Sequence, residues 1–347
     1  MIRGPKGGST ALLVLYAFLY FSLYALFGLL LKVYQGPSSA GFPGQTDIEF
    51  LVYSTAGSAL VCLGVIFGGK WWQAQWSGRE LLYIAAAGTF TAFVIPTTKL
   101  IYSLQISVMV AMIVMRGSII VISRAVDAAL AWQGVSGKKV RWEENLAVLF
   151  ALAAVSLNVA YAKEGDFEFL RSGAALTILG IYLVSYSLRL YFMNYFKFTR
   201  SPNHTAEKKN YFAVEQLVAS FWIFGFVGLA FFFPIPGGAP IANAITSPHP
   251  QWLSALLLAG VPFGIGAFFS AFLFLFEGRT ATFSALANRL SSLLAGVAST
   301  LLFAFFYAGK WPKNEDWASL ALVLIAVALL AKAETQNSLL QSPQKFP

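Results

Sequence analysis

Long apolar segments recur along the whole chain, and they constrain its fold more than any other feature. Ten runs of about 20 residues are each long enough to cross about 30 Å of hydrocarbon as an α-helix. Only 11% of the 347 residues are charged, and 58% are hydrophobic. The runs cover approximately residues 10–31, 50–69, 80–98, 107–131, 145–162, 173–196, 212–233, 253–276, 281–306 and 317–332. We therefore predict an all-α membrane protein with ten transmembrane helices.

The basic residues are distributed unevenly between the two sides of this predicted bundle. With a cytoplasmic N-terminus, inner loops and tails carry 14 Lys and Arg residues and outer loops carry six. The inner set is Arg3, Lys6, Lys70, Arg79, Lys138, Lys139, Arg141, Lys197, Arg200, Lys208, Lys209, Arg279, Lys332 and Lys345; the outer set is Lys32, Lys99, Lys163, Arg171, Lys310 and Lys313. The positive-inside rule then predicts that both termini are cytoplasmic. We expect a multi-pass protein of a bacterial inner membrane rather than of an internal eukaryotic membrane. The net charge of +9 needs no nucleic-acid partner as its explanation.

The chain also resembles itself at a fixed offset. A shift of 173 residues places Arg116 on Arg289 and Glu143 on Asp316, and it brings "ENLAVLFALAAVSLNVAYAK" beside "DWASLALVLIAVALLAKAE". Five spans per half is an odd number, so the second half must lie inverted relative to the first. We predict two inverted five-helix repeats: residues 1–165, and residues 166–347 with a short cytoplasmic tail.

Ten spans in two halves, with a fourth span of the form "SVMVAMIVMRGSIIVISRAVDAAL" before a short charged loop, resemble the drug/metabolite transporter superfamily. That superfamily includes EamA-type permeases and nucleotide-sugar transporters. The sharpest local match is "MRGS" at residues 115–118. The resemblance implies a central cavity lined by spans one to four and six to nine, with spans five and ten packed outside. It would place the arginines of spans four and nine on the cavity wall.

Span four carries three charged residues, Arg116, Arg124 and Asp127, in an otherwise apolar segment. A charge at the centre of a bilayer costs about 2.5–3.5 kcal/mol on insertion scales unless it faces water, protein or a partner. At about 100° per residue, Arg116 and Asp127 lie about 20° apart around the helix. One side of span four is therefore predicted to face away from lipid.

Arg116 and Arg289 occupy similar depths in their oppositely directed spans, so both are predicted to lie near the middle of the membrane. One hypothesis is that they attract an anionic substrate, because guanidinium groups bind carboxylate or phosphate in a bidentate manner. The other is that each arginine binds helix-end carbonyls or a carboxylate and holds the spans together.

The remaining charged residues also allow two interpretations. Arg124 and Asp127 are separated by one helical turn, which favours an ion pair within the helix, joined by Arg189 or Glu215 from other spans. Such a pair could couple transport to an ion or could be purely structural. Glu215 begins span seven. It is either a buried carboxylate that couples transport to protons or an interfacial carboxylate that faces water.

Tyrosines repeat at helical spacing in two spans. Tyr182, Tyr186 and Arg189 follow an i, i+4, i+7 pattern, so two phenols and one guanidinium share a face of span six. The stripe in the first span is Tyr16, Tyr20 and Tyr24. Such faces suit a small amphipathic anion or an aromatic solute, and we expect four of these residues to bind substrate: Tyr20, Tyr182, Tyr186 and Arg189. Packing between helices is the alternative explanation.

Small residues predict where helices approach closely. Gly64 and Gly68, and Gly260 and Gly264, form small-xxx-small pairs. Pro262, within the second pair's span, removes a backbone hydrogen bond and permits a bend. We expect close helix packing at these positions.

The sequence contains no phosphate-loop motif, no HExxH motif and a single cysteine, Cys62, so we predict neither an enzyme nor a bound metal or cofactor. The expected function is secondary active transport of a small organic solute, with an anionic metabolite favoured because buried arginines outnumber buried carboxylates. A proton or a counter-solute could supply the energy. The alternatives are efflux of amino acids or amphipathic drugs, and a membrane scaffold that transports nothing. The oligomeric state is left open.

Overall fold

The structure, a computed structural model, describes residues 9–73, 78–103, 108–136, 140–161, 172–199, 205–234, 238–307, 311 and 314–341. Every secondary-structure element within these ranges is helical. The helices are α1 (Thr10–Tyr34), α2 (Asp47–Gly68), α3 (Gly78–Ser103), α4 (Val108–Trp132), α5 (Trp142–Ala160), α6 (Gly173–Thr199), α7 (Thr205–Phe232), α8 (Ala239–Thr246), α9 (Trp252–Ser254), α10 (Gly260–Phe274), α11 (Ala281–Tyr307) and α12 (Asn314–Gln341). Short helical turns are η1 (Ser38–Ala40), η2 (Trp71–Gln73) and the π-helical η4 (Ala255–Ala259).

Each of the ten predicted spans contains a helix. At the eighth span, α9, η4 and α10 together form one long helical segment. Seven of these segments, within the described residues, are long and apolar enough to cross a membrane by themselves. They are α1, α2, α3, α6, α7, the α9–α10 segment and α11. The chain is therefore a multi-pass, all-helical membrane protein. The predicted boundary between residues 165 and 166 lies outside the described residues.

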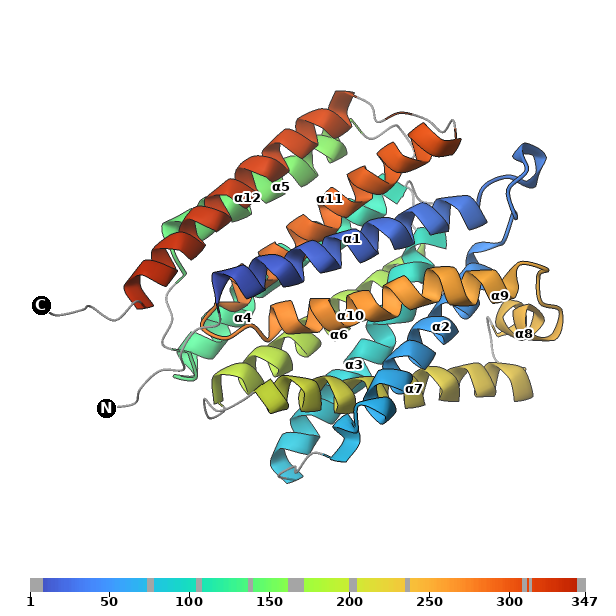
Figure 1. The fold of residues 1–347 in the computed structure, drawn as a ribbon, viewed down its shortest axis with the longest axis horizontal. Helices are drawn as coiled ribbons and strands as arrows, with labels where there is room; N and C mark the ends of the chain where they lie inside the picture. The colour runs from blue at the N-terminus through green and yellow to red at the C-terminus, as the bar shows by residue number, and fades with distance from the viewer. Residues whose placement is uncertain are drawn as a thin grey trace, which may run out of the picture.

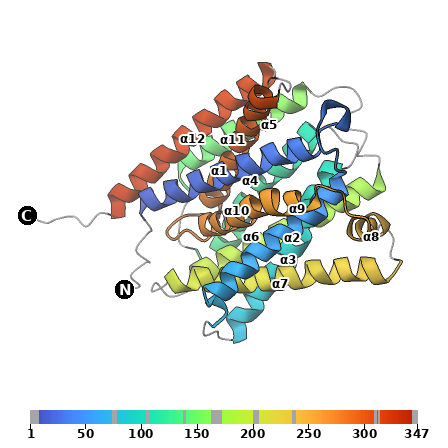
Figure 2. The same cartoon turned by 45° about the vertical axis from the view of Figure 1, so that its right-hand side comes forward.

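The long helices form one bundle, in which α5 and α12 lie side by side along one edge while α3 and α7 lie along the opposite edge (Figures 1 and 2). Helix α3 packs against α6 and α7, and α10 packs against α1 and α2. Helices α4 and α11 contact each other between these groups. The start of α1 and the end of α12 lie at the same end of the bundle (Figure 1).

Local sequence explains where several helices begin. Thr46 precedes α2 and accepts a hydrogen bond from the Glu49 amide, while the Glu49 carboxylate accepts one from the Thr46 amide at 2.8 Å. This capping box satisfies two of the amides that a helix start leaves without partners. Helix α11 begins in the same manner, since the Thr280 hydroxyl accepts from the amide of Phe283 at 3.0 Å.

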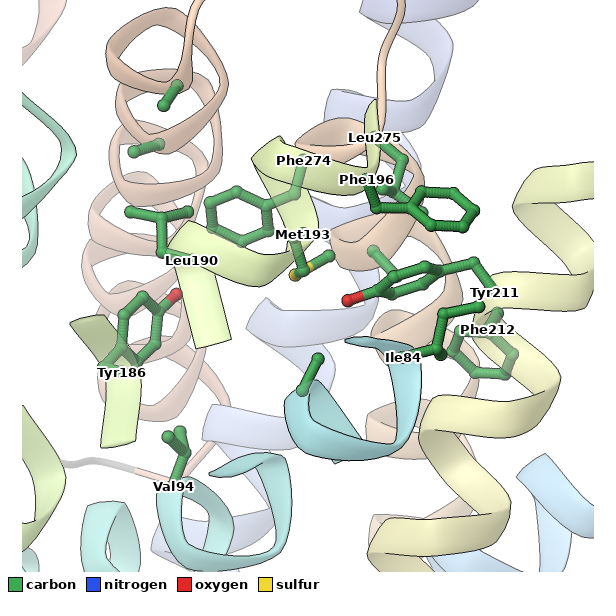
Figure 3. Close-up of a cluster of buried hydrophobic side chains, with 14 of the residues drawn as sticks. Ile84, Val94, Tyr186, Leu190, Met193, Phe196, Tyr211, Phe212, Phe274 and Leu275 are labelled. Atoms are coloured by element: carbon green, nitrogen blue, oxygen red, sulfur yellow. The ribbon is translucent and has the colours of Figure 1, made fainter. Parts of the chain in front are cut away.

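The interior contains two large apolar clusters. One joins α3, α4, α6, α7, α10 and α11, and it includes Tyr186, Met193, Tyr211 and Phe212 (Figure 3). The other joins α1, α5, α11 and α12 with Ile120 of α4. The candidate site lies where α1, α6 and α11 meet between the two clusters.

Candidate functional site

Arg289 is a charged residue inside the bundle without an ionic partner among the described residues. It projects from α11, and its Nη2 donates a hydrogen bond to the Tyr186 hydroxyl of α6. Its guanidinium carbon lies 4.8 Å from the centre of the Tyr186 ring, in a cation–π contact. The Nε atom is buried and has no hydrogen-bond partner. The guanidinium is thus held by Tyr186, and its buried Nε donor is unused.

Four tyrosines lie within electrostatic range of this guanidinium. Tyr182 and Tyr186 on α6 are 1% and 4% exposed, and the hydroxyl groups of Tyr20 and Tyr24 on α1 also lie within electrostatic range of Arg289. Their rings contact each other in pairs, with centroids 5.7 Å apart on α6 and 5.5 Å apart on α1. We call Tyr20, Tyr24, Tyr182 and Tyr186 the tyrosine cage. Four-residue spacing brings each pair to one helix face.

Of the residues predicted to bind substrate, the structure brings Tyr20, Tyr182, Tyr186 and Arg289 near one another, whereas Arg189 pairs with Glu215. Tyr16, the remaining member of the α1 stripe, packs against Phe269 and Phe272 of α10 instead. The backbone of Arg116 belongs to α4, but its side chain lies outside what the structure describes.

Arg189 and Glu215 form a second buried charged group. Arg189 Nε on α6 donates to Glu215 Oε1 on α7 at 2.8 Å, and the two side chains are 11% and 0% exposed. The hydroxyl of Thr91 on α3 accepts from Arg189 Nε at 2.7 Å and donates to Glu215 Oε1 at 2.7 Å. The predicted alternative, an interfacial carboxylate that faces water, is wrong for Glu215, because α7 begins ten residues earlier and the residue is 0% exposed.

Asp127 has a different role from the one predicted. Its two carboxylate oxygens accept hydrogen bonds from the backbone amides of Ala281 and Thr282, each at 2.7 Å, and the residue is 8% exposed. No contact between Arg124 and Asp127 is present among the described side chains, so the predicted ion pair within α4 is not formed. Arg124 instead lies within electrostatic range of Glu144. The Asp127 carboxylate, which bonds to the first amides of α11, is stabilised by the positive end of that helix's dipole.

The short loop between α10 and α11, residues 275–280, and the two helix ends beside it receive contacts from four helices. Thr280 donates to Glu144 Oε2 of α5 at 2.8 Å, beside the Asp127 contact from α4. Lys208 of α7 pairs with Glu277 at 3.1 Å. Lys197 of α6 donates to the carbonyl of Phe274, just before the loop, at 3.0 Å. These polar contacts join four helices at one end of the bundle.

Sequence reasoning missed Thr91, Glu144 and Thr280. Threonine is common in membrane helices, where its hydroxyl bonds the preceding turn, so its type alone carries no signal. Glu144 lies in the first turn of a helix, a position that acidic residues favour for local reasons. Only the pairing of distant helices reveals these roles.

An apolar groove opens on the outer surface between α4, α5 and α6, with a cavity volume of about 590 Å³. Its lining contains no charged side chain. The residues are Gly117, Ser118, Val121, Ile122, Leu152, Leu183, Val184, Ser187 and Leu188. The groove lies on a different face of α6 from Tyr182 and Tyr186, and its lining side chains Val121 and Val184 are more than half exposed.

Comparison with known proteins gives the fold and no more. No family model matches the chain, and no curated protein matches it. A crystal structure described only as that of a protein is similar, with a TM-score of 0.58 over 96% of this chain and 100% of the other. The two sequences are 16% identical, so the similarity extends to helix arrangement alone.

Proposed function

We propose that this protein is a secondary active transporter of the drug/metabolite type that carries a small organic anion by alternating access. The observation that carries the proposal is Arg289, a guanidinium inside an apolar bundle with no carboxylate bound to it among the described residues. Burying such a charge is costly unless something offsets it. A carboxylate or phosphate of a bound solute would supply the missing negative charge.

The surroundings of Arg289 fit a particular kind of anion. The unused Nε donor and the Nη groups can bind two oxygens side by side. The tyrosine cage adds hydroxyl donors and aromatic faces, which favour a solute whose remainder is apolar or planar. The substrate we favour is therefore a small metabolite with one carboxylate or phosphate and a flat or hydrophobic body.

The packing of helices supports the two inverted repeats of this proposal. If α1 to α5 correspond to α6, α7, α10, α11 and α12 in that order, the contacts of α3 with α6 and α7 become those of α10 with α1 and α2. The α4–α5 contact likewise becomes the α11–α12 contact, and the α4–α11 and α5–α12 contacts map onto themselves. Two equivalent halves that meet around one site are the arrangement that alternating access requires.

The polar contacts around residues 275–280 support a state that is closed at one end. With the N-terminus in the cytoplasm, this closed end is the inner one, because the last residues of α4 and the first of α11 lie there. The driving force would be a gradient of solute or ions.

The groove between α4, α5 and α6 favours a second candidate, the efflux of amphipathic molecules. It is apolar and opens laterally, so a hydrophobic solute could enter it from the bilayer. The two candidate functions differ in whether binding of the solute requires Arg289.

Substitution of Arg289 tests the proposal. A panel of small carboxylates and phosphates is screened by thermal shift on the purified protein, because a ligand that binds only the native state raises its apparent stability. We expect Arg289→Gln to weaken binding of the best anion by about 10- to 150-fold, the equivalent of one charge-assisted hydrogen bond of about 1.5–3 kcal/mol. Arg289→Lys should weaken it less, since the charge remains.

Arg141→Gln is the matched control, because Arg141 pairs with Glu143 and Gln336 at the start of α5 and lies outside the cage. Counterflow of the same anion in proteoliposomes then measures transport. Unchanged binding and counterflow in Arg289→Gln would remove the anion proposal and leave amphipathic efflux. Binding without counterflow in the wild-type protein would instead favour the scaffold.

A further inference from the structure

The apolar groove between α4, α5 and α6 lies at the middle of its long helices. Its lining residues on α4 lie between positions 117 and 122 of a helix that begins at residue 108, and those on α6 lie between positions 183 and 188 of a helix that begins at residue 173. The side chains of Val121 and Val184 are 54% and 58% exposed, and the Ser187 hydroxyl already donates to a carbonyl of its own helix at 2.7 Å. The groove therefore presents an apolar surface at the depth of the lipid chains.

The size of the groove suits one hydrocarbon chain. Its volume of about 590 Å³ is within the range of small-molecule sites, about 300–1,000 Å³. One water molecule occupies roughly 30 Å³ in the liquid, and a methylene group needs a similar volume. A methyl group on Gly117 would lie 3.1 Å from Cγ1 of Val155 on α5, so glycine at this position lets α4 approach α5 closely beside the groove.

A basic residue follows the groove along α4. Helices α4 and α6 run in the same direction here, because their middle residues line the groove together and the later residues Tyr191 and Gln133 pair beyond it, with the tyrosine hydroxyl donating to Gln133 Oε1 at 2.9 Å. Arg124 lies between these two levels, three residues after Val121 and seven after Gly117. Residues with this spacing share one side of a helix, so Arg124 lies at the end of the groove, about 4.5 Å beyond Val121 along the axis.

The guanidinium of Arg124 is available to a ligand. Arg124 is partly exposed, and it has no hydrogen bond or ion pair within the part of the chain that the structure describes. The carboxylate of Asp127 is bonded to the first amides of α11, and that of Glu144, which lies within electrostatic range of Arg124, accepts from Thr280. Both carboxylates are therefore engaged by other donors, and the five N–H groups of Arg124 remain for another acceptor.

The order of groups along α4 matches that of a phospholipid. Trp132, the last residue of α4, is 88% exposed, and tryptophan concentrates at the interface between membrane and water. Arg124 lies eight residues before it, about 12 Å nearer the middle of the membrane, and a long arginine side chain can extend toward the interface. From the interface inward there is thus first a cation and then an apolar groove. A phospholipid likewise has a charged phosphate at the interface and acyl chains beneath it.

We propose that the groove between α4, α5 and α6 binds an acyl chain of an anionic phospholipid whose phosphate is held by Arg124. In the orientation indicated by the basic loops, this lipid belongs to the cytoplasmic leaflet, where anionic lipids attract basic residues. A neutral amphipathic solute in the same groove would not need Arg124. The proposal is independent of the proposed function, because neither Arg289 nor the tyrosine cage takes part in it.

The stabilising effect of lipids tests the charged part of this site. Purified protein in detergent is titrated with dioleoyl phosphatidylglycerol, which is anionic, or with zwitterionic dioleoyl phosphatidylcholine, and the rise in apparent Tm gives the affinity of each lipid. We expect the anionic lipid to bind about fivefold more tightly, as one arginine near a membrane surface provides. Arg124→Gln should remove this preference and Arg124→Lys should retain it. Arg141→Gln is the matched control on the same side, because Arg141 pairs with Glu143 and Gln336.

A larger side chain in the groove tests the apolar part. Val121→Phe fills space at an exposed position, so we expect it to weaken the binding of both lipids by about fivefold or more. Val14→Phe on α1 is the matched control, since Val14 is 60% exposed and lies outside the groove. Native mass spectrometry, which counts the lipids bound to each chain, should find one phosphatidylglycerol fewer on Val121→Phe than on Val14→Phe. Val184→Phe, on the opposite wall, should repeat the result if Val121→Phe folds poorly.

Equal affinity of the two lipids for the wild-type protein would overturn the proposal, and if Val121→Phe still weakens both, the groove takes apolar chains without regard to charge. Equal losses in Arg124→Gln and Arg141→Gln would show a general attraction to the basic surface instead of a site. Equal losses in Val121→Phe and Val14→Phe would likewise exclude the groove. Arg289→Gln should leave both lipid affinities unchanged, so the lipid site and the proposed anion site succeed or fail separately.

Discussion

Asp127 and Glu215 are both carboxylates within long apolar helices, and the difference in their partners determines what each can do. Asp127 has both oxygens bonded to backbone amides at the start of α11. Glu215 has one oxygen bonded and one unsatisfied. A carboxylate with both oxygens bonded is a structural element, whereas a carboxylate with one unbonded oxygen can still accept a further hydrogen bond. Burial alone does not separate the two, because both side chains are hidden.

Asp127→Asn tests the structural role. The amide oxygen can accept from only one of the two backbone amides, and the NH₂ group would face the other donor. We expect the free energy of unfolding to fall by about 1–3 kcal/mol, measured as a lower apparent Tm in detergent. Asp47→Asn, at the exposed first turn of α2, is the control and should cost at most about 1 kcal/mol. Equal losses in both variants would contradict the assignment.

At the scale of helices, close approach is concentrated at α2, η4 and α10. A methyl group on Gly57 would overlap the carbonyl oxygen of Leu256 and lie 3.1 Å from Gly260 Cα, and one on Gly264 would lie 2.9 Å from the Ser58 carbonyl oxygen. The prediction of close packing is correct for Gly260 and Gly264. Nothing lies within 4 Å of the corresponding positions on Gly64 or Gly68, which face outward from this contact.

The π-helical turn lies in the same contact. Pro262 has no N–H to bond the carbonyl of Leu258 four residues earlier, so the regular hydrogen-bond pattern is interrupted next to η4. The wider turn places the Leu256 carbonyl against Gly57. Small residues on both sides are needed because the two backbones touch.

Gly57→Ala should therefore destabilise the protein by about 1–3 kcal/mol, as overpacking does in other interiors. Gly64→Ala is the matched control on the same helix. Open space surrounds Gly64, so a methyl group there meets no neighbour. We expect Gly64→Ala to leave the free energy of unfolding unchanged or to raise it slightly, because alanine favours a helix over glycine by up to about 1 kcal/mol. Thermal unfolding of both variants in one detergent measures the difference. A stable Gly57→Ala protein would show that α2 and η4 separate readily.

At the scale of the whole molecule, the contacts around residues 275–280 join elements of both halves at one end of the bundle. Helix α5 reaches this loop from the first half through Glu144, and α4 reaches the adjoining start of α11 through Asp127, while Lys208 reaches the loop from the second half. An alternating-access protein must break such contacts to open that end. Their polar nature allows them to be replaced by water when the halves move apart.

Labelling from the two sides of the membrane tests this movement. A cysteine in place of Tyr24, which is partly buried in the cage, is introduced into a Cys62→Ala background and exposed to a membrane-impermeant thiol reagent in vesicles of either orientation. In the proposed orientation these contacts lie at the inner end and keep it closed, so we expect faster labelling from the outer side. Adding Asp127→Asn should raise the rate from the inner side several-fold. Identical rates from both sides in both proteins would contradict a closed inner end.

Several features of the site could be read from the chain itself. Four-residue spacing placed Tyr182 with Tyr186, and an arginine in an apolar span pointed to an interior function for Arg289, because local geometry and the cost of buried charge are properties of one helix. The partners of Asp127 and Glu215 could not be found in this way. The carboxylate of Asp127 bonds to residues 154 and 155 positions away, and the Arg189 contact crosses from α6 to α7.

The sequence by itself determined that the chain is a set of membrane-crossing helices, because apolar segments of that length must satisfy their backbone hydrogen bonds internally in lipid. It also determined where those helices lie and which residues are costly to bury. Only the tertiary structure decided which buried charges are neutralised, since a charge in a span can be offset by any of several neighbouring helices. Arg189 received a carboxylate, Asp127 a helix end, and Arg289 a cage of phenols, which carry no full charge to oppose it.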